Sequence, residues 1–261
     1  MKPRKRKLVA VMACRADSTR LYAKPLQNLV AGKTVLDQKL DTLLSLGNVV
    51  ADSIIAISEG TENLCYIDVA KRRKIRYLFG SKSDILSRIV NGGLYAGATD
   101  VLRLTSENPF IWWEKLPEAW DVHLQEDNDL TVTDGCPLGS YFEIIRLDAL
   151  LTAYERANAY QREACTQYFR DYPDQFKIRV LTPSKDRFRL DVRLTIDNPE
   201  DLVVCRQIYE HFQDQTPLIP LSEIVRLWDE RPLFKQLLDP YITGKGIWVN
   251  NEGCSWAPAK R

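Results

Sequence analysis

Residues 8–26, LVAVMACRADSTRLYAKPL, change from an apolar run to a polar, basic segment, and the fold prediction depends on this change. Residues 8–14 are apolar and long enough for one buried strand. The next segment carries three cationic side chains and two hydroxyls: Arg15, Ser18, Thr19, Arg20 and Lys24. In open α/β sheets, ligands bind beyond the carboxyl ends of the strands, where cations hold phosphate oxygens by charged hydrogen bonds. We therefore expect residues 15–24 to bind a polyphosphate; the alternative is a solvated basic loop.

Strand-like runs alternate with helical patterns over the first half of the chain. Short β-branched runs predict buried strands, and apolar residues at helical spacing predict the helices between them. In chain order, the predicted elements are a strand at 8–14, a helix at 35–46, a strand at 53–58, a helix at 61–71, a strand at 75–79, a helix at 84–95 and a strand at 100–105. This alternation predicts an α/β fold with a mostly parallel, Rossmann-like sheet sandwiched between helices.

The pattern changes from residue 129. The expected elements there are strands at 130–133 and 140–146, helices at 148–160 and 162–172, and a strand pair formed by 176–181 and 188–194. We expect residues 129–190 to form an inserted α+β lobe that closes over the substrate and makes subunit contacts. Residues 1–240 are predicted to be one domain, and residues 241–261 an irregular tail.

Composition excludes several classes of protein. The chain of 261 residues has 36 Lys and Arg against 35 Asp and Glu, a formal net charge of +1, so no global field favours nucleic acid or a membrane surface. No apolar run approaches the roughly 18 residues of a membrane span. The six cysteines form no CxxC pair, which indicates reduced thiols, and with only two histidines a polyhistidine metal site is not expected. We predict a cytoplasmic protein.

Two carboxylates follow predicted strands directly. Glu107 comes after strand 100–105, and Asp197 comes after strand 188–194. Carboxylates at strand ends are suitable ligands for a divalent cation. The alternative for both is helix capping, and Pro199 suits the first turn of the helix that follows Asp197.

An ordered series of motifs resembles the sugar-activating cytidylyltransferases, which include the synthetases of CMP-activated 3-deoxy-octulosonic and sialic acids. ACRADSTRLYAKPL resembles their A-R-x-x-S-x-R-L-x-x-K-x-L signature. The other matching segments are GSKSDILSR, RLTSENPFI, REACTQYFRDYPDQFKI, RLTIDNPEDL and SEIVRLWDERP. The similarity covers about residues 8–240 and is strongest to the branch of spore coat polysaccharide biosynthesis protein F.

The resemblance implies transfer of CMP from CTP to a sugar acid or a similar polar acceptor, such as a phosphonate, with release of pyrophosphate for surface polysaccharide synthesis. The residues that would hold the CTP phosphates are Arg15, Ser18, Arg20, Lys24 and Ser81, and those that would bind the acceptor are Arg103, Glu143 and Arg162. Glu107 and Asp197 would bind Mg²⁺, and Lys24, Arg15 and Asp197 would be catalytic. A homodimer is implied as well.

The chain departs from the family pattern at a few positions. Glu107 replaces the usual Asp, Tyr22-Ala23 replaces Pro-Gly, and Ala164 replaces His. Two alternatives therefore stay open. One is a catalytically silent nucleotide-binding protein, and the other is a glycosyltransferase that uses a nucleotide-sugar, although the usual D-x-D motif of such enzymes is missing from the ends of the apolar strands.

Overall fold

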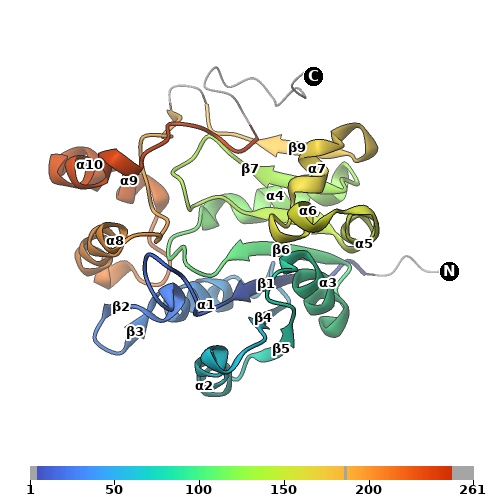
Figure 1. The fold of residues 1–261 in the computed structure, drawn as a ribbon. Coiled ribbons are helices and arrows are strands. Elements are labelled where there is room, and N and C mark those ends of the chain that lie inside the picture. The colour runs from blue at the N-terminus through green and yellow to red at the C-terminus, as the bar shows by residue number, and fades with distance from the viewer. Residues whose placement is uncertain (1–4, 185–186, 249–261) are drawn as a thin grey trace.

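The centre of the molecule is a seven-stranded sheet in the order β5-β4-β1-β6-β8-β7-β9 (Figure 1). The computed structural model describes residues 5–184 and 187–248. The strands are β1 (Leu8–Cys14), β4 (Asp52–Ser58), β5 (Arg76–Gly80), β6 (Asp100–Thr105), β7 (Leu130–Thr133), β8 (Glu143–Arg146) and β9 (Ile178–Leu181). Among these seven strands only β8 runs antiparallel to its neighbours. The predicted mostly parallel α/β fold is confirmed.

Helices cover both faces of the sheet because β1 is apolar on both sides. Its residues Leu8, Ala10 and Met12 pack with α1, α2 and α4, whereas Val9 and Val11 pack with α3, α5 and α7. The helices of these two layers are α1 (Val35–Ser45), α2 (Cys65–Arg73), α3 (Ile85–Ala96), α4 (Leu116–Gln125), α5 (Leu147–Arg156), α6 (Ala159–Glu163) and α7 (Gln167–Asp171).

A third apolar cluster lies beside the sheet, where Figure 1 shows α8 next to the small hairpin β2–β3, with α9 and α10 beyond α8 on the same side. These elements are β2 (Asn28–Val30), β3 (Lys33–Thr34), α8 (Pro199–His211), α9 (Leu221–Glu230) and α10 (Pro232–Leu238). Pro199 occupies the first turn of α8, as predicted, and the N-cap of this helix is Asn198.

The segment 129–190, expected as an inserted lobe, contributes β7, β8 and β9 to the central sheet. The predicted pairing of residues 176–181 with 188–194 is wrong. β9 pairs with β7, and the second segment makes only an isolated bridge between Leu138 and Arg193. The two predicted helices at 148–160 and 162–172 are three helices in the structure: α5 ends at Arg156, and α6 and α7 are separated because Cys165 between them has φ +59°, outside the helical region.

The first part of the C-terminal tail is packed against the sheet. Trp248 is 1% exposed and lies in the apolar cluster that includes α3 and α5. Its backbone N–H donates to the carboxylate of Asp134, and its indole N–H donates to Glu143 Oε1 at 3.4 Å. The remainder of the predicted tail, residues 249–261, lies outside the described residues.

Candidate functional site: a cationic pocket beyond β1 and β6

The loop after β1 folds back on itself beyond the carboxyl end of the sheet. The Ala23 N–H donates to the Ala16 carbonyl at 2.8 Å, and the Ala16 N–H donates to Oδ1 of the buried Asn63 at 2.7 Å. Ala23 has φ +46°, the left-handed conformation that glycine adopts without strain. The loop therefore keeps a glycine-like backbone at the position where the family has glycine.

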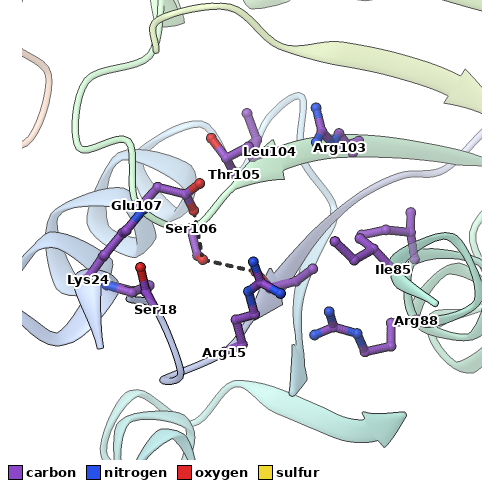
Figure 2. Close-up of a pocket in the computed structure, with 13 residues that line it drawn as sticks. Arg15, Ser18, Lys24, Ile85, Arg88, Arg103, Leu104, Thr105, Ser106 and Glu107 are labelled. Atoms are coloured by element: carbon purple, nitrogen blue, oxygen red, sulfur yellow. Dashed lines mark hydrogen bonds between the residues drawn. The ribbon is translucent and has the colours of Figure 1, made fainter. Parts of the chain in front are cut away.

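A pocket opens between this loop, the end of β6 and the first turns of α3 (Figure 2). β1 and β6 are neighbours in the sheet, so residues after both strands reach the same place. The side chains that line the pocket are Ala13, Arg15, Ser18, Lys24, Pro25, Ile85, Arg88, Ile89, Arg103, Leu104, Thr105, Ser106 and Glu107.

Positive charge dominates this lining, because four cations (Arg15, Lys24, Arg88 and Arg103) face one carboxylate, Glu107. Arg103 is neutralised by the buried Glu143, whose Oε2 lies 3.2 Å from its guanidinium. Within the described part of the chain, Arg15 and Arg88 have no ion pair. An anionic ligand such as a polyphosphate would supply the missing negative charge.

Asp197 lies next to the pocket and is surrounded by cations. Its Oδ1 accepts a hydrogen bond from Lys24 Nζ at 2.7 Å and lies 3.3 Å from Arg20, while its Oδ2 lies 3.0 Å from Arg193. Burial acts to raise the pKa of Asp197, but Lys24, Arg20 and Arg193 together hold that pKa below its usual value. Asp197 therefore stays ionised and fixes the position of Lys24.

Four of the predicted ligand-binding residues do not line this pocket: Ser81, Arg20, Arg162 and Glu143. Ser81 follows β5 and lies outside the lining. Arg20 is largely exposed and pairs with Asp197. Arg162 uses its guanidinium within the fold: it donates to Asp84 at 2.9 Å and to the carbonyls of Ala157 and Tyr154. Through these hydrogen bonds, Arg162 connects α5 to the start of α3.

Glu143, predicted to bind the acceptor, is also held inside the fold. It pairs with Arg103 across β6 and β8, and its Oε1 accepts a hydrogen bond from Thr166 at 3.1 Å. The predicted pair of acceptor contacts, Arg103 and Glu143, is thus one buried ion pair, of which Arg103 reaches the pocket.

The two predicted metal ligands differ in availability. In the described residues, no three His, Cys, Asp or Glu side chains are grouped so as to hold a metal ion. Glu107 faces the pocket, and its carboxylate accepts one hydrogen bond, from Ser106 at 3.3 Å. Asp197 is paired with Arg20, Lys24 and Arg193. Mg²⁺ bound mainly by phosphate and water needs only one or two protein carboxylates, a requirement that Glu107 fits.

Sequence reasoning gave no role to Arg88, although it is the last residue of the motif GSKSDILSR. It lies on α3 among apolar residues, and its place in the pocket becomes visible only when α3 is packed against β1. The same holds for Asn63, which anchors the loop from the segment before α2.

The parallel sheet and the cationic pocket beyond β1 and β6 define a nucleotide-binding α/β protein. Comparison with known proteins gives the family: the cytidylyltransferase family model matches residues 9–242, so the chain belongs to that family of nucleotidyltransferases. The resemblance found in the sequence motifs is confirmed.

Two curated relatives align over most of the chain. A protein of Methanocaldococcus jannaschii is 26% identical over 232 residues, covering 88% of this chain and 94% of its own. The spore coat polysaccharide biosynthesis protein SpsF of Bacillus subtilis is 27% identical over 233 residues, covering 86% of this chain and 95% of its own.

Solved structures share the fold. A cytidylyltransferase from Leptospira borgpetersenii superposes with a TM-score of 0.78 at 20% identity, covering 88% of this chain and 97% of its own. The CTP complex of CMP:2-keto-3-deoxy-manno-octonic acid synthetase superposes with a TM-score of 0.61 at 15% identity, covering 78% and 99%. Within the described residues, no helix is long and apolar enough to cross a membrane.

Proposed function

We propose that this nucleotidyltransferase transfers CMP from CTP to a sugar acid or a similar small polar acceptor, such as a phosphonate, and releases pyrophosphate. The observation that carries the proposal is the positive charge beside the loop after β1, where Arg15 lines the pocket and has no ion pair within the described residues. The acceptor class is supported by the names of two similar proteins, one of spore coat polysaccharide biosynthesis and one CMP:2-keto-3-deoxy-manno-octonic acid synthetase.

In the proposed reaction, an acceptor oxygen attacks the α-phosphorus of CTP. The new O–P bond forms as the bond to the bridging oxygen breaks, so negative charge develops on the departing pyrophosphate. Arg15 and Lys24 would stabilise this charge by charged hydrogen bonds, assisted by the Ser18 hydroxyl. Because Asp197 already holds Lys24 at 2.7 Å, the ammonium group needs little reorganisation when the nucleotide binds.

We include Mg²⁺ in the proposal, held by Glu107 together with phosphate oxygens and water. When bound, it would neutralise charge on the phosphate oxygens. Asp197 is a second ligand only if it leaves its cationic partners, so we assign it first to the positioning of Lys24.

The test is release of pyrophosphate on mixing the full chain with CTP, Mg²⁺ and a panel of keto-deoxy sugar acids, sialic acid and phosphonates. We expect release that depends on both CTP and one of the acceptors, and at least about tenfold slower turnover in Arg15→Ala, which loses a charged hydrogen bond. Absence of acceptor-dependent release across the panel would contradict the proposal.

A second candidate, a nucleotide-binding protein without turnover, is favoured by the pairing of Asp197 with three cations. Calorimetry separates the two candidates. For the enzyme, Mg²⁺ should strengthen CTP binding through Glu107, and Glu107→Gln should remove that effect. CTP binding that is insensitive to Mg²⁺, together with no turnover, would favour the second candidate.

We also propose that the protein acts as a homodimer in the cytoplasm. Five cysteines of the described segments are unpaired, which suits a reducing compartment. Light scattering on the purified chain should give twice the mass of 30.0 kDa, and a monomer would contradict the dimer.

A further inference from the structure

Arg88 on α3 is a buried cation with three of its five N–H donors unused within the described residues. Arg88 is 1% exposed, and its Nη1 donates hydrogen bonds to the carbonyls of Cys14 and Ala56, each at 3.1 Å. Within the described residues, Nε and Nη2 have no hydrogen-bond partner, and no carboxylate pairs with the guanidinium. Buried arginines are rare without partners, so the free Nε/Nη2 edge indicates a ligand.

The position of this guanidinium is built into the fold. Nη1 is held at the ends of β1 and β4, and the side-chain stem crosses the backbone of Gly80 at the end of β5. A Cβ at Gly80 would lie 2.7 Å from Arg88 Cγ, so only glycine leaves room for this path. Three adjacent strands thus fix the Nε/Nη2 edge of Arg88 relative to the pocket.

The two ends of the pocket differ in chemistry. Figure 2 shows Ser18, Lys24 and Glu107 at one end, and Ile85 and Arg88 at the other. The first end suits phosphates and their counter-ion. Arg15 lies between the two ends in Figure 2. The second end combines the apolar side chains of α3 with the free donors of Arg88, which suit the faces and edge of a nucleobase. This orientation depends on the proposed function, in which the loop holds the triphosphate of CTP.

A pair of donors on one guanidinium edge matches two adjacent acceptors. Cytosine presents such a pair, O2 and N3, on its Watson–Crick edge, whereas uracil carries a hydrogen on N3 and would place a donor against a donor. We propose that Arg88 recognises the cytosine base of CTP by donating from Nε and Nη2 to N3 and O2, and so selects CTP over UTP.

The first test uses the unaltered protein and changes the ligand. Calorimetry with CTP, UTP and 3-deaza-CTP, in which a C–H group replaces the N3 acceptor, measures the contribution of this atom. We expect both analogues to bind at least about tenfold more weakly than CTP, since each loses a hydrogen bond to a charged donor. Equal affinity for CTP and 3-deaza-CTP would overturn the proposal without requiring any variant to fold.

The second test assigns the effect to Arg88. In Arg88→Met, which keeps the side-chain stem as far as the ε position and removes all the N–H donors, the ratio of the affinity for CTP to that for UTP or 3-deaza-CTP should fall to near one. Affinity for pyrophosphate should stay within about twofold of the native protein. Arg226→Met removes an exposed arginine of α9 and should change neither quantity.

The other possible outcomes also distinguish between the roles of Arg88. If Arg88→Met weakens CTP, UTP and pyrophosphate equally, Arg88 binds phosphate and the proposal is wrong. If it changes no affinity, its role is structural. A native protein that binds neither CTP nor pyrophosphate contradicts the proposed function itself, whereas CTP binding with an unchanged preference in the variant contradicts only the assignment of Arg88.

Discussion

At the scale of single residues, the conformation of Ala23 limits what its position accepts. Ala23 is buried and has φ +46°, a region that β-branched side chains strongly disfavour. We expect Ala23→Val to lower the free energy of unfolding by at least about 2 kcal/mol, through backbone strain and overpacking. Ala23→Gly should stay within about 1 kcal/mol of the native protein, because relief of strain offsets the loss of a methyl group. Equal losses in the two variants on urea denaturation would contradict this account.

Lys39 on α1 is a buried ammonium group beside the core. It is 0% exposed, its Nζ has no hydrogen-bond partner in the described residues, and burial lowers its pKa to about 7 even though the charge of Glu107 acts to raise it. Because the unfolded state keeps this proton up to about pH 10, protein stability should rise with pH above 7 as the folded state releases it.

Lys39→Met should remove this pH dependence. At pH 7 and below, we expect the variant to be about 1–4 kcal/mol more stable, since an unpaired buried charge is replaced by an apolar chain. The difference between the two proteins should shrink towards pH 10. Urea denaturation at pH 6 to 10 measures it, and a difference that does not vary with pH would show that Lys39 does not titrate in this range.

At the scale of elements, α3 lies unusually close to β1 and presents Arg88 and two isoleucines to the pocket. A Cβ at Gly92 would lie 2.5 Å from Val11 Cγ1, so the contact requires glycine on the helix. We expect Gly92→Ala to destabilise the protein by about 1–3 kcal/mol, although alanine is the better helix former by about 1 kcal/mol. Asn91→Ala, on the exposed side of the same helix, should be neutral or slightly stabilising in the same denaturation experiment.

The strands of the parallel sheet could be predicted closely, because strands buried on both faces are continuous apolar runs. The prediction of a strand at 188–194 was wrong because the alternation of polar and apolar residues in this segment has another cause. Arg189 pairs with Asp229 of α9, and Arg193 pairs with Asp201 of α8, so these side chains join this segment to the two helices. The break at Cys165 could not be predicted either, because tertiary packing holds a buried non-glycine residue at positive φ.

At the scale of the whole molecule, the predicted tail returns to the core through Trp248. We expect Trp248→Ala to cost about 3–5 kcal/mol of the free energy of unfolding, the usual loss for a large buried aromatic. Tyr160→Ala, which removes a ring that is 66% exposed, should have little effect. Comparable stability of the two variants would mean that the tail does not contribute to the core.

The candidate site was predictable in part. The phosphate-binding loop could be inferred because strand, charge and hydroxyls are contiguous in residues 8–26. Pairs from distant segments could not. Arg103 and Glu143 meet through the register of β6 and β8, Asp197 meets Lys24 across 173 residues, and Arg88 reaches the pocket only through the packing of α3. These relations depend on three-dimensional arrangement, which periodicity and motifs do not encode.

The central claim, that this pocket binds the triphosphate of CTP, is tested most directly by calorimetric titration of CTP and Mg²⁺ into the native chain and Lys24→Ala. We predict one site per chain and a loss of about ten- to a hundredfold in affinity in the variant, the effect of removing one charged hydrogen bond. Lys71→Ala, which removes an exposed lysine of α2, should bind as the native chain does. No binding to the native chain, or equal affinity in Lys24→Ala, would contradict the claim.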